Sequence, residues 1–279
     1  GVELIVVDDG STDDTAAVVR EVALAARWVA QANAGVCAAR NRGLALARGR
    51  FVAFLDQDDI WHPQQLARQV GWLEAHPDVG AAVCRYIHWR PVDGRYLAPE
   101  GLWGADPGAG VDPEFSGWVF HQFLWDCWAL TSGTLLRRDL VAEAGGFDES
   151  LPYSEDWDLW LRLSQRAPFA LLNWPPVLYR HHAVQGSRTV RRRDFRVELL
   201  ERYARRHGLA SADGRAMPAA RFAETLARYR FEFGLHHVAH GDRWTGVRAL
   251  FDGWRRRPAR LRRLAVALAA CTGWRPRSD

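Results

Sequence analysis

The chain has 279 residues, of which 48% are hydrophobic and 25% are charged, and this composition excludes a disordered or fibrous protein. No apolar run reaches the roughly 18 residues that a membrane-spanning helix needs, and no signal-type segment is found, so we expect a cytoplasmic protein. The formal net charge of +4 hides an asymmetry, because residues 1–187 carry 24 acids against 15 arginines and residues 188–279 carry 22 arginines against 9 acids. This asymmetry predicts two regions with different surroundings.

A strand, an acidic turn and a helix are predicted at the start of the chain. The apolar run 2–7 predicts a short strand that ends in Asp8 and Asp9. The segment Ser11–Asp14 has the spacing of a capping box, and the residues from 15 to 26 have helical periodicity.

The same order of elements then repeats. A turn at 33–35 is followed by an Ala- and Leu-rich helix that ends near 47, and the run 51–55 predicts a second strand. This strand leads into three carboxylates, Asp56, Asp58 and Asp59. The next helix carries its apolar face on Leu66, Val70 and Leu73. Such repetition predicts an α/β fold with a mainly parallel sheet that binds ligands beyond the carboxyl ends of its strands.

The middle of the chain gives weaker signals. Residues 79–86 and 130–136 are predicted to be strands, and the Gly-, Pro- and Trp-rich stretch 90–118 is predicted to be a long surface excursion. A helix is expected to begin near Ser154, and the signal from 190 onward is helical and rich in arginine.

The second acidic turn is a candidate metal site. Carboxylates a few ångströms apart either raise one another's pKa or bind a cation. No His or Cys stands beside them in the sequence, and a site of oxygen ligands alone favours Mg²⁺ or Mn²⁺ over zinc. Such an ion usually shares its coordination shell with substrate phosphates. The alternative is a solvated turn whose Asp side chains cap the following helix. The acids Asp8 and Asp9 at another strand end favour the metal and diphosphate site.

Glu155 and Asp156 form a later acidic pair at a predicted helix start. Acids are common there because they interact favourably with the helix macrodipole, so a purely structural role is one interpretation. The other is a carboxylate general base, which must reach the proton that it removes.

Several motifs occur in an order typical of one family. They are VVDDGSTDDT, NAGVCAARNRG, GRFVAFLDQDD, GGFDES with SEDWDLWLRLS, and YRHHAVQGS. In this order they resemble bacterial family 2 glycosyltransferases of the GT-A fold, over roughly residues 2–187. The resemblance implies a Rossmann-like domain over 1–187, with a mainly parallel sheet flanked by helices, and leaves 188–279 as an Arg-rich helical C-terminal region.

The resemblance also implies how a nucleotide-sugar donor is held. Asp9 resembles the acid that contacts the nucleotide base, with Asp8 beside it. Asp58 resembles the residue of the acidic motif that reaches the ribose and the diphosphate. Arg40 and Asn41 lie in the family's glycine-turn helix and are weaker candidates for donor contact.

The metal and the catalytic base are implied in the same way. Asp58 and Asp59 resemble the acids that hold Mn²⁺ or Mg²⁺ on the diphosphate, and His182 resembles a His near the metal, with a plain surface His as the alternative. Asp156 resembles the base that deprotonates the acceptor hydroxyl, with Glu155 as its neighbour.

The implied reaction is inverting, metal-dependent sugar transfer. The expected donor is a nucleotide sugar, with a UDP-sugar favoured, and the expected acceptor is a glycan or lipid-linked hydroxyl in cell-envelope or exopolysaccharide synthesis. A sugar-nucleotide-binding or scaffolding remnant without turnover is the alternative. A phosphatase that uses Asp8 as nucleophile is disfavoured because no matching Lys is present.

Two features lie outside the shared motifs. Family members begin with a further strand and helix, so we expect that this sequence lacks the first β-α unit and is weakly active or unstable alone. The segment 255–270 combines clustered Arg with a short aliphatic face, which fits peripheral contact with an anionic inner membrane or an Arg-rich helical appendage that covers the sheet. Nucleic-acid binding has no supporting motif.

Overall fold

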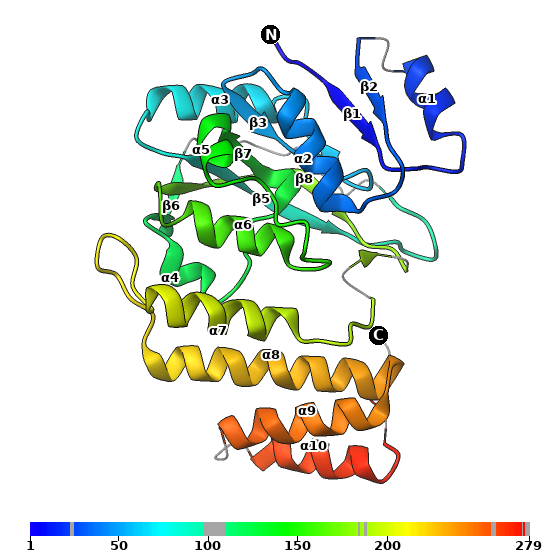
Figure 1. Cartoon of the computed structure of the whole chain (residues 1–279), viewed down its shortest axis with the longest axis vertical. Coiled ribbons are helices and arrows are strands. Elements are labelled where there is room, and N and C mark those ends of the chain that lie inside the picture. The colour runs from blue at the N-terminus through cyan, green and yellow to red at the C-terminus, as the bar shows by residue number, and fades with distance from the viewer. Residues whose placement is uncertain are drawn as a thin grey trace. The chain divides into compact units, whose positions relative to one another are not determined.

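The computed structural model describes residues 1–22, 25–97, 110–183, 185–186, 189–257, 261–274 and 276 (Figure 1). The chain divides into two compact units. Unit 1 comprises Gly1–Phe123 and Cys127–His182, and unit 2 comprises Leu124–Asp126 and Ala183–Asp279. The domain boundary expected between 187 and 188 lies outside the described residues.

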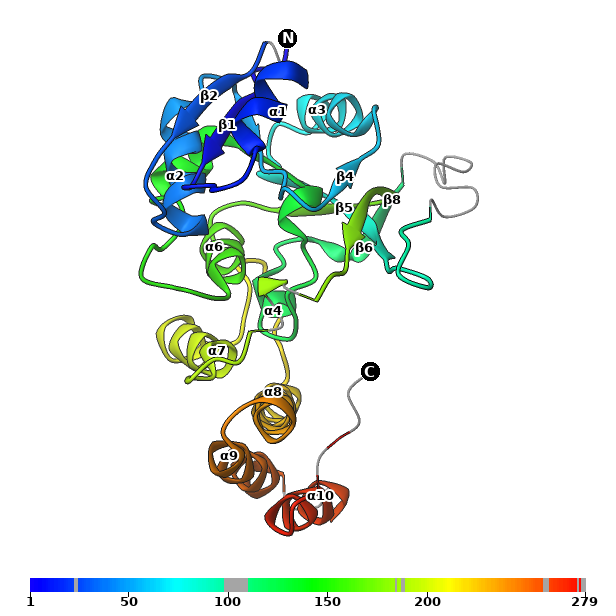
Figure 2. The same ribbon diagram turned by 90° about the vertical axis from the view of Figure 1, so that its right-hand side faces the viewer.

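A small parallel sheet begins unit 1. Its strands are β1 (Ile5–Asp8) and β2 (Arg27–Ala30), which are connected through α1 (Thr15–Val22). Parallel neighbours need a crossover of this kind. The next helix, α2 (Val36–Leu46), packs against β1 (Figures 1 and 2). The strand and helix predicted at the start of the chain are confirmed.

A six-stranded sheet forms the centre of unit 1. In spatial order its strands are β3 (Phe51–Ala53), β7 (Thr134–Arg137), β5 (Ala81–Trp89), β8 (Phe169–Arg180) and β4 (Ile60–Trp61), and β6 (Val111–Gly117) also pairs with β8. Within the described part of the chain, β5 and β8 are its one parallel pair, and the other four pairings are antiparallel.

The α/β class is confirmed, but the expectation of a mainly parallel sheet is wrong. It rested on the strand-helix repetition before residue 76, and strands that follow crossover helices run parallel. The strands β4, β6 and β7 do not end such units, so nothing constrains them to run parallel to their neighbours. The weak signals of the middle segment concealed β6 and β8 altogether.

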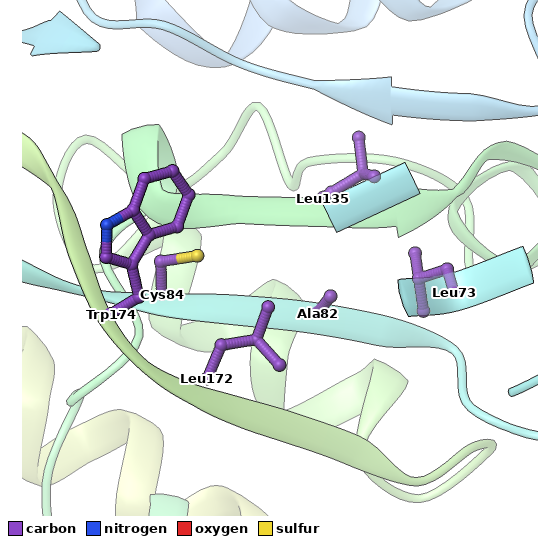
Figure 3. Packing of buried hydrophobic residues seen from close by; sticks show 6 residues of the cluster. All are labelled: Leu73, Ala82, Cys84, Leu135, Leu172 and Trp174. Carbon is purple, nitrogen blue, oxygen red and sulfur yellow. The ribbon is translucent and has the colours of Figure 1, made fainter. Parts of the chain in front are cut away.

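The central sheet is buried on both faces. Successive residues along a strand point to opposite faces, so one strand supplies side chains to both. Leu172 and Trp174 of β8 pack on one face with Leu73, Ala82, Cys84 and Leu135, as Figure 3 shows. Phe169 of β8 points to the other face and contacts Phe123 and Trp160 edge to face. Helix α3 (Gln65–Ala75) covers the first face, whereas α4 (Phe120–Phe123) and α6 (Glu155–Leu163) contribute to the second.

Four further elements of unit 1 position the site. They are α3 (Gln65–Ala75), η1 (Thr131–Gly133), α5 (Arg138–Glu143) and α6 (Glu155–Leu163), and α4 (Phe120–Phe123) precedes η1. The fully buried residues of α3 are Gln65, Gln69 and Leu73, which are spaced by four. Leu66 and Val70, expected with Leu73 on the apolar face, are partly buried and pack against the same core, as predicted.

Unit 2 consists of helices with a close contact between two of them. The helices are α7 (Phe195–His207), α8 (Ala219–His240), α9 (Arg243–Arg256) and α10 (Leu261–Cys271). A Cβ on Gly246 of α9 would lie 2.7 Å from the carbonyl oxygen of Gly234 in α8 and 2.8 Å from the amide nitrogen of Val238. Glycine therefore lets the two backbones touch, and Val238, Val247 and Leu250 form a core beside them. Among the helices described, none has both the length and the apolar character that a membrane span requires.

Candidate active site

Asp9 ties together the carboxyl ends of β1 and β2. Its Oδ1 accepts hydrogen bonds from Gln31 Nε2 and Ala34 N, both at 2.8 Å, and its Oδ2 accepts one from Gly35 N at 2.8 Å. Burial alone would raise the pKa of Asp9, but these hydrogen bonds outweigh it and lower the pKa. The carboxylate is therefore ionised and fixed in direction at the strand end where the family resemblance predicts nucleotide contact.

The turn beside Asp9 is held by local bonds. Asp8 Oδ1 accepts from Ser11 N at 2.8 Å, and Asp13 Oδ1 accepts from Thr15 N at 3.1 Å. Helix α1 begins at Thr15, which is one turn later than a cap at Ser11 would place it. The predicted capping box is therefore wrong, because Ser11 lies inside the turn that Asp8 holds.

The second acidic turn brings Asp58 against a histidine. Asp58 Oδ2 lies 2.8 Å from His182 Nε2, although the residues are 124 positions apart, and Arg180 Nε donates to Asp58 O at 2.9 Å. In the sequence the turn has no His beside it, but β8 places one there. Of the residues predicted to hold a metal, Asp58 and His182 are therefore in direct contact.

Asp59 lies deeper than its neighbours, with only 7% of its surface exposed. Its Oδ1 accepts from Arg180 N at 3.1 Å. Burial raises its pKa to about 6, although the nearby Ser132 hydroxyl and the Arg180 amide lower it. Its Oδ2 has no hydrogen bond of normal geometry with any described residue. A buried carboxylate oxygen without a hydrogen-bond partner lowers the stability of the fold unless a cation binds to it.

Arg40 joins the acidic turn to the helix that carries the other acidic pair. Its Nη2 lies 2.6 Å from Asp56 Oδ1, and its Nη1 lies 3.0 Å from Glu155 Oε1. The backbone of Asp56 is also fixed, because its N donates a hydrogen bond to Ser132 Oγ at 3.1 Å. The turn after β3 and the start of α6 are therefore adjacent.

Asp156 follows Glu155 in the first turn of α6. Burial first, and then the charge of Glu155, raise its pKa to about 7 against the opposing effect of Arg40. Its Oδ1 accepts from Trp157 N at 2.7 Å, and the residue keeps some exposure to solvent. The preceding Ser154 is buried with a left-handed φ of 63°, a conformation in which backbone strain is common at functional sites.

Asn41, predicted as a weak donor contact, is bonded to the protein through both ends of its amide. Its Oδ1 accepts from Phe147 N at 2.8 Å, and its Nδ2 donates to Phe147 O at 2.9 Å and Glu149 Oε1 at 2.8 Å. Gly146 has a φ of +68°, and a Cβ there would lie 2.5 Å from Asn41 Oδ1. Asn41 thus bonds the GGFDES loop to α2 at the position that follows Arg40.

Sequence reasoning missed two buried glutamines that support the acidic turn. Gln65 Nε2 donates to Ser132 O at 2.9 Å, and Gln69 Nε2 donates to Gly133 O at 2.9 Å and Ala82 O at 2.8 Å. They fix η1, whose Ser132 in turn bonds the acidic turn. Their spacing of four with Leu73 is the signal that could have revealed them.

A divalent cation is only partly provided for by the protein. Among the residues that the structure describes, no group of three or more His, Cys, Asp or Glu side chains is arranged to hold a metal. Asp58 and His182 nevertheless offer an oxygen and a nitrogen in contact, and Asp59 has an unpartnered oxygen nearby. By donor type, the Asp58 carboxylate and the His182 imidazole suit Mg²⁺ or Mn²⁺, which commonly take few protein ligands and complete the shell with water and phosphate.

Two family models match this chain. Residues 1–113 match a family model described as glycosyl transferase family 2, and residues 117–208 match a second one described as glycosyltransferase like family 2. Together the two segments take in more than half of the chain. The chain belongs to glycosyltransferase family 2.

Curated family 2 relatives match over part of their length. The chain is 29% identical over 176 residues to chondroitin synthase of Escherichia coli, covering 61% of this chain and 23% of the relative. It is 25% identical over 194 residues to an uncharacterised glycosyltransferase of Rickettsia prowazekii, covering 67% and 57%. The chain thus spans less than two thirds of these relatives.

Solved structures show the same fold. Residues 1–349 of S. aureus TarS, in complex with UDP-GlcNAc, superpose with a TM-score of 0.60 and 20% identity over 97% of this chain and 78% of TarS. The UDP complex of the same protein gives a TM-score of 0.58 at 19% identity, over 97% and 78%. At this identity the likeness carries the fold alone, and the GT-A fold expected for family 2 is confirmed.

Proposed function

We propose that the protein is an inverting, metal-dependent glycosyltransferase that moves a sugar from a nucleotide sugar to an acceptor hydroxyl. The observation that carries this proposal is the Arg40 bridge, because it sets Asp156 close to the turn of Asp56 and Asp58. A base and a diphosphate site must be neighbours for a single displacement. Family membership supports the reaction class.

In the proposed reaction, the acceptor oxygen forms a bond to the anomeric carbon while the bond from that carbon to the diphosphate oxygen breaks. Asp156 takes the acceptor proton, and the nucleoside diphosphate leaves with the bonding electron pair. A pKa near 7 suits this base at neutral pH, since it is partly ionised and still basic. One displacement inverts the anomeric centre. The neighbouring Glu155 is engaged by Arg40, so we do not assign it as a nucleophile.

Asp58 and His182 are the residues that we propose hold the cation, with Asp59 as a third candidate through its unpartnered oxygen. A bound Mg²⁺ or Mn²⁺ offsets the negative charge that builds on the leaving diphosphate. Arg180 fixes the turn for this role, because its Nε and its amide bond Asp58 and Asp59 respectively.

The donor is proposed to lie along the carboxyl ends of β1 and β3. Asp9 is fixed there and ionised, which suits hydrogen bonding to a nucleobase, and Asp8 lies beside it in the turn. A UDP-sugar is favoured because the TarS structures of the same fold hold UDP-GlcNAc and UDP. Arg40 and Asn41, both engaged within the protein, support the site without the need to touch the donor.

The acceptor is proposed to be a glycan or lipid-linked hydroxyl in envelope or exopolysaccharide synthesis, at the inner face of the plasma membrane. Among the described residues of unit 2, the large apolar side chains that are exposed are Trp244, Leu268 and Trp274. The surplus of arginine over acid in residues 188–279 complements an anionic surface. Binding to phosphatidylserine vesicles, lost when Trp244 and Trp274 are replaced by Ser, would support this contact. Equal binding to neutral vesicles or none would end it.

The function is tested by nucleoside diphosphate release from UDP-, GDP- and dTDP-sugars, with and without Mn²⁺, in parallel with thermal shift. Turnover that needs Mn²⁺ and is lost in Asp156→Asn supports the proposal. A donor that raises the melting temperature without any release, across acceptors from simple sugars to lipid-linked glycans, would leave the sugar-nucleotide-binding remnant as the better interpretation.

A further inference from the structure

Arg40 has a geometry that a donor contact would not require. Its guanidinium bonds a residue 16 positions away and another 115 positions away, so it connects α2, the turn after β3 and the start of α6. Only 11% of the side chain is exposed. Both terminal nitrogens therefore face carboxylates of the protein, in the forked arrangement that arginine forms best.

The surroundings of Arg40 hold it in place. Its guanidinium lies 5.2 Å from the centre of the Phe147 ring. The backbone of Phe147 is bonded on both sides by Asn41, the next residue of α2, so that ring and guanidinium are fixed from the same helix. Such locking keeps a charged group in one orientation without further loss of entropy.

Arg40 is also the cation that balances the local negative charge. Burial disfavours its charged form, but Asp56 and Glu155 outweigh burial and raise its pKa, and Asp156 adds to this effect. The charged groups that act on Asp156 in return are Glu155 on its own helix, Arg40 on α2 and Asp56 on the acidic turn. Removal of Arg40 would leave three acids facing one another.

We propose that Arg40 is a positioning residue for sugar transfer, whose guanidinium ties the turn beside the donor diphosphate to the helix that carries the catalytic base. This inference rests on the proposed function. Arg40 is then expected to have two separate effects. Its two hydrogen bonds, to Asp56 and Glu155, form a fork that sets the distance between the base and the donor, and its positive charge assists loss of the proton from Asp156. A misplacement of about 1 Å in such a site costs on the order of 100-fold in rate.

Two variants separate the fork from the charge. Arg40→Met keeps the volume and removes both, so kcat is expected to fall about 100-fold and the midpoint of the kcat-pH profile to move upward. Arg40→Lys restores the charge but bonds one carboxylate at a time, so the midpoint is expected to return toward that of the wild type while kcat stays about tenfold low. The donor Kd, measured by calorimetry, should change less than about threefold in Arg40→Lys.

Arg162→Lys is the matched control. Arg162 forms an ion pair of 2.8 Å with the buried Asp158 on the same helix α6, but neither residue is part of the proposed site. This variant tests whether loss of an arginine fork on α6 alone slows the reaction. It is expected to keep the kcat and the pH midpoint of the wild type.

The outcomes are distinct. A donor Kd that rises in step with the loss of kcat, with no movement of the pH midpoint, would make Arg40 a donor contact and overturn the proposal. Wild-type kcat in Arg40→Lys, or an equal loss in Arg162→Lys, would overturn it as well. If Arg40→Met does not fold, Arg40→Lys decides through kcat and Kd. If the wild type releases no nucleoside diphosphate at all, the proposed function itself fails, and this role fails with it.

Discussion

Asp58 Oδ2 and His182 Nε2 lie 2.8 Å apart in unit 1, across 124 positions of sequence. The contact depends on the pairing of β4 with β8, because Asp58 lies just before one strand and His182 just after the other. Arg180 fastens the same two segments through Asp58 O and Asp59 Oδ1. The acidic turn is therefore bonded at three points to the last strand of unit 1 and the residues that follow it.

Removal of this pair should weaken metal binding. We expect His182→Ala to raise the Kd for Mn²⁺ in the presence of donor by at least about tenfold, because a small number of protein ligands leaves each one important. Titration calorimetry of the full chain measures this. His76→Ala is the control, since the exposed His76 at the end of α3 stacks on Trp72. Equal heats for the His182→Ala variant and the wild type would remove His182 from the metal site.

The rate should depend on pH through Asp156. Burial, and then Glu155, raise the pKa of this carboxyl to about 7, and a base works only when ionised. We therefore expect kcat at saturating donor and Mn²⁺ to rise as the pH increases through about 7 and then to level off. The pH profile of kcat is obtained from nucleoside diphosphate release measured between about pH 5.5 and 9. A flat profile over this interval would exclude Asp156 as the base.

Asp156→Asn should trade activity for stability. The folded-state pKa lies above the ordinary value of 3.8, so the unfolded chain releases this proton at lower pH and ionisation destabilises the fold as the pH rises toward 7. At pH 8 the Asn variant is expected to melt higher, on the order of 3 °C, while kcat falls at least about 100-fold. At pH 4 the melting temperatures should converge. A lower melting temperature at pH 8 would contradict the raised pKa.

The α8-α9 contact of unit 2 should be sensitive to a single methyl group. Gly246→Ala is expected to lower the free energy of unfolding by about 2 kcal/mol, because its Cβ would meet the Gly234 carbonyl at 2.7 Å. Gly71→Ala is the matched control: Gly71 lies inside α3 with no atom within 4 Å of the new Cβ. There the same change should stabilise by about 0.5–1 kcal/mol. Urea unfolding of both variants tests the contrast, and equal effects would mean that the helices do not touch.

Local signals allowed a large part of unit 1 to be predicted. The strand-turn-helix order, both acidic turns and the start of α6 follow from patterns within a few residues, such as apolar runs and turn chemistry. The predicted apolar face of α3 is confirmed, because Leu73 lies in the core and Leu66 and Val70 pack against it, whereas the predicted capping box at Ser11 failed. A competing local bond, from Ser11 N to Asp8 Oδ1, keeps Ser11 in the turn, and the glutamines of α3 were missed because their partner η1 is distant in the sequence.

By itself the sequence determined which residues carry charge at strand ends and helix starts, and it placed the chain in its family. Only the tertiary structure decided which of these residues are in contact: His182 with Asp58, and Arg40 with both Asp56 and Glu155. It also decided that the central sheet is mixed. The physical reason is range, since propensity and periodicity act over a few residues, whereas these contacts depend on the order and direction in which distant strands pair.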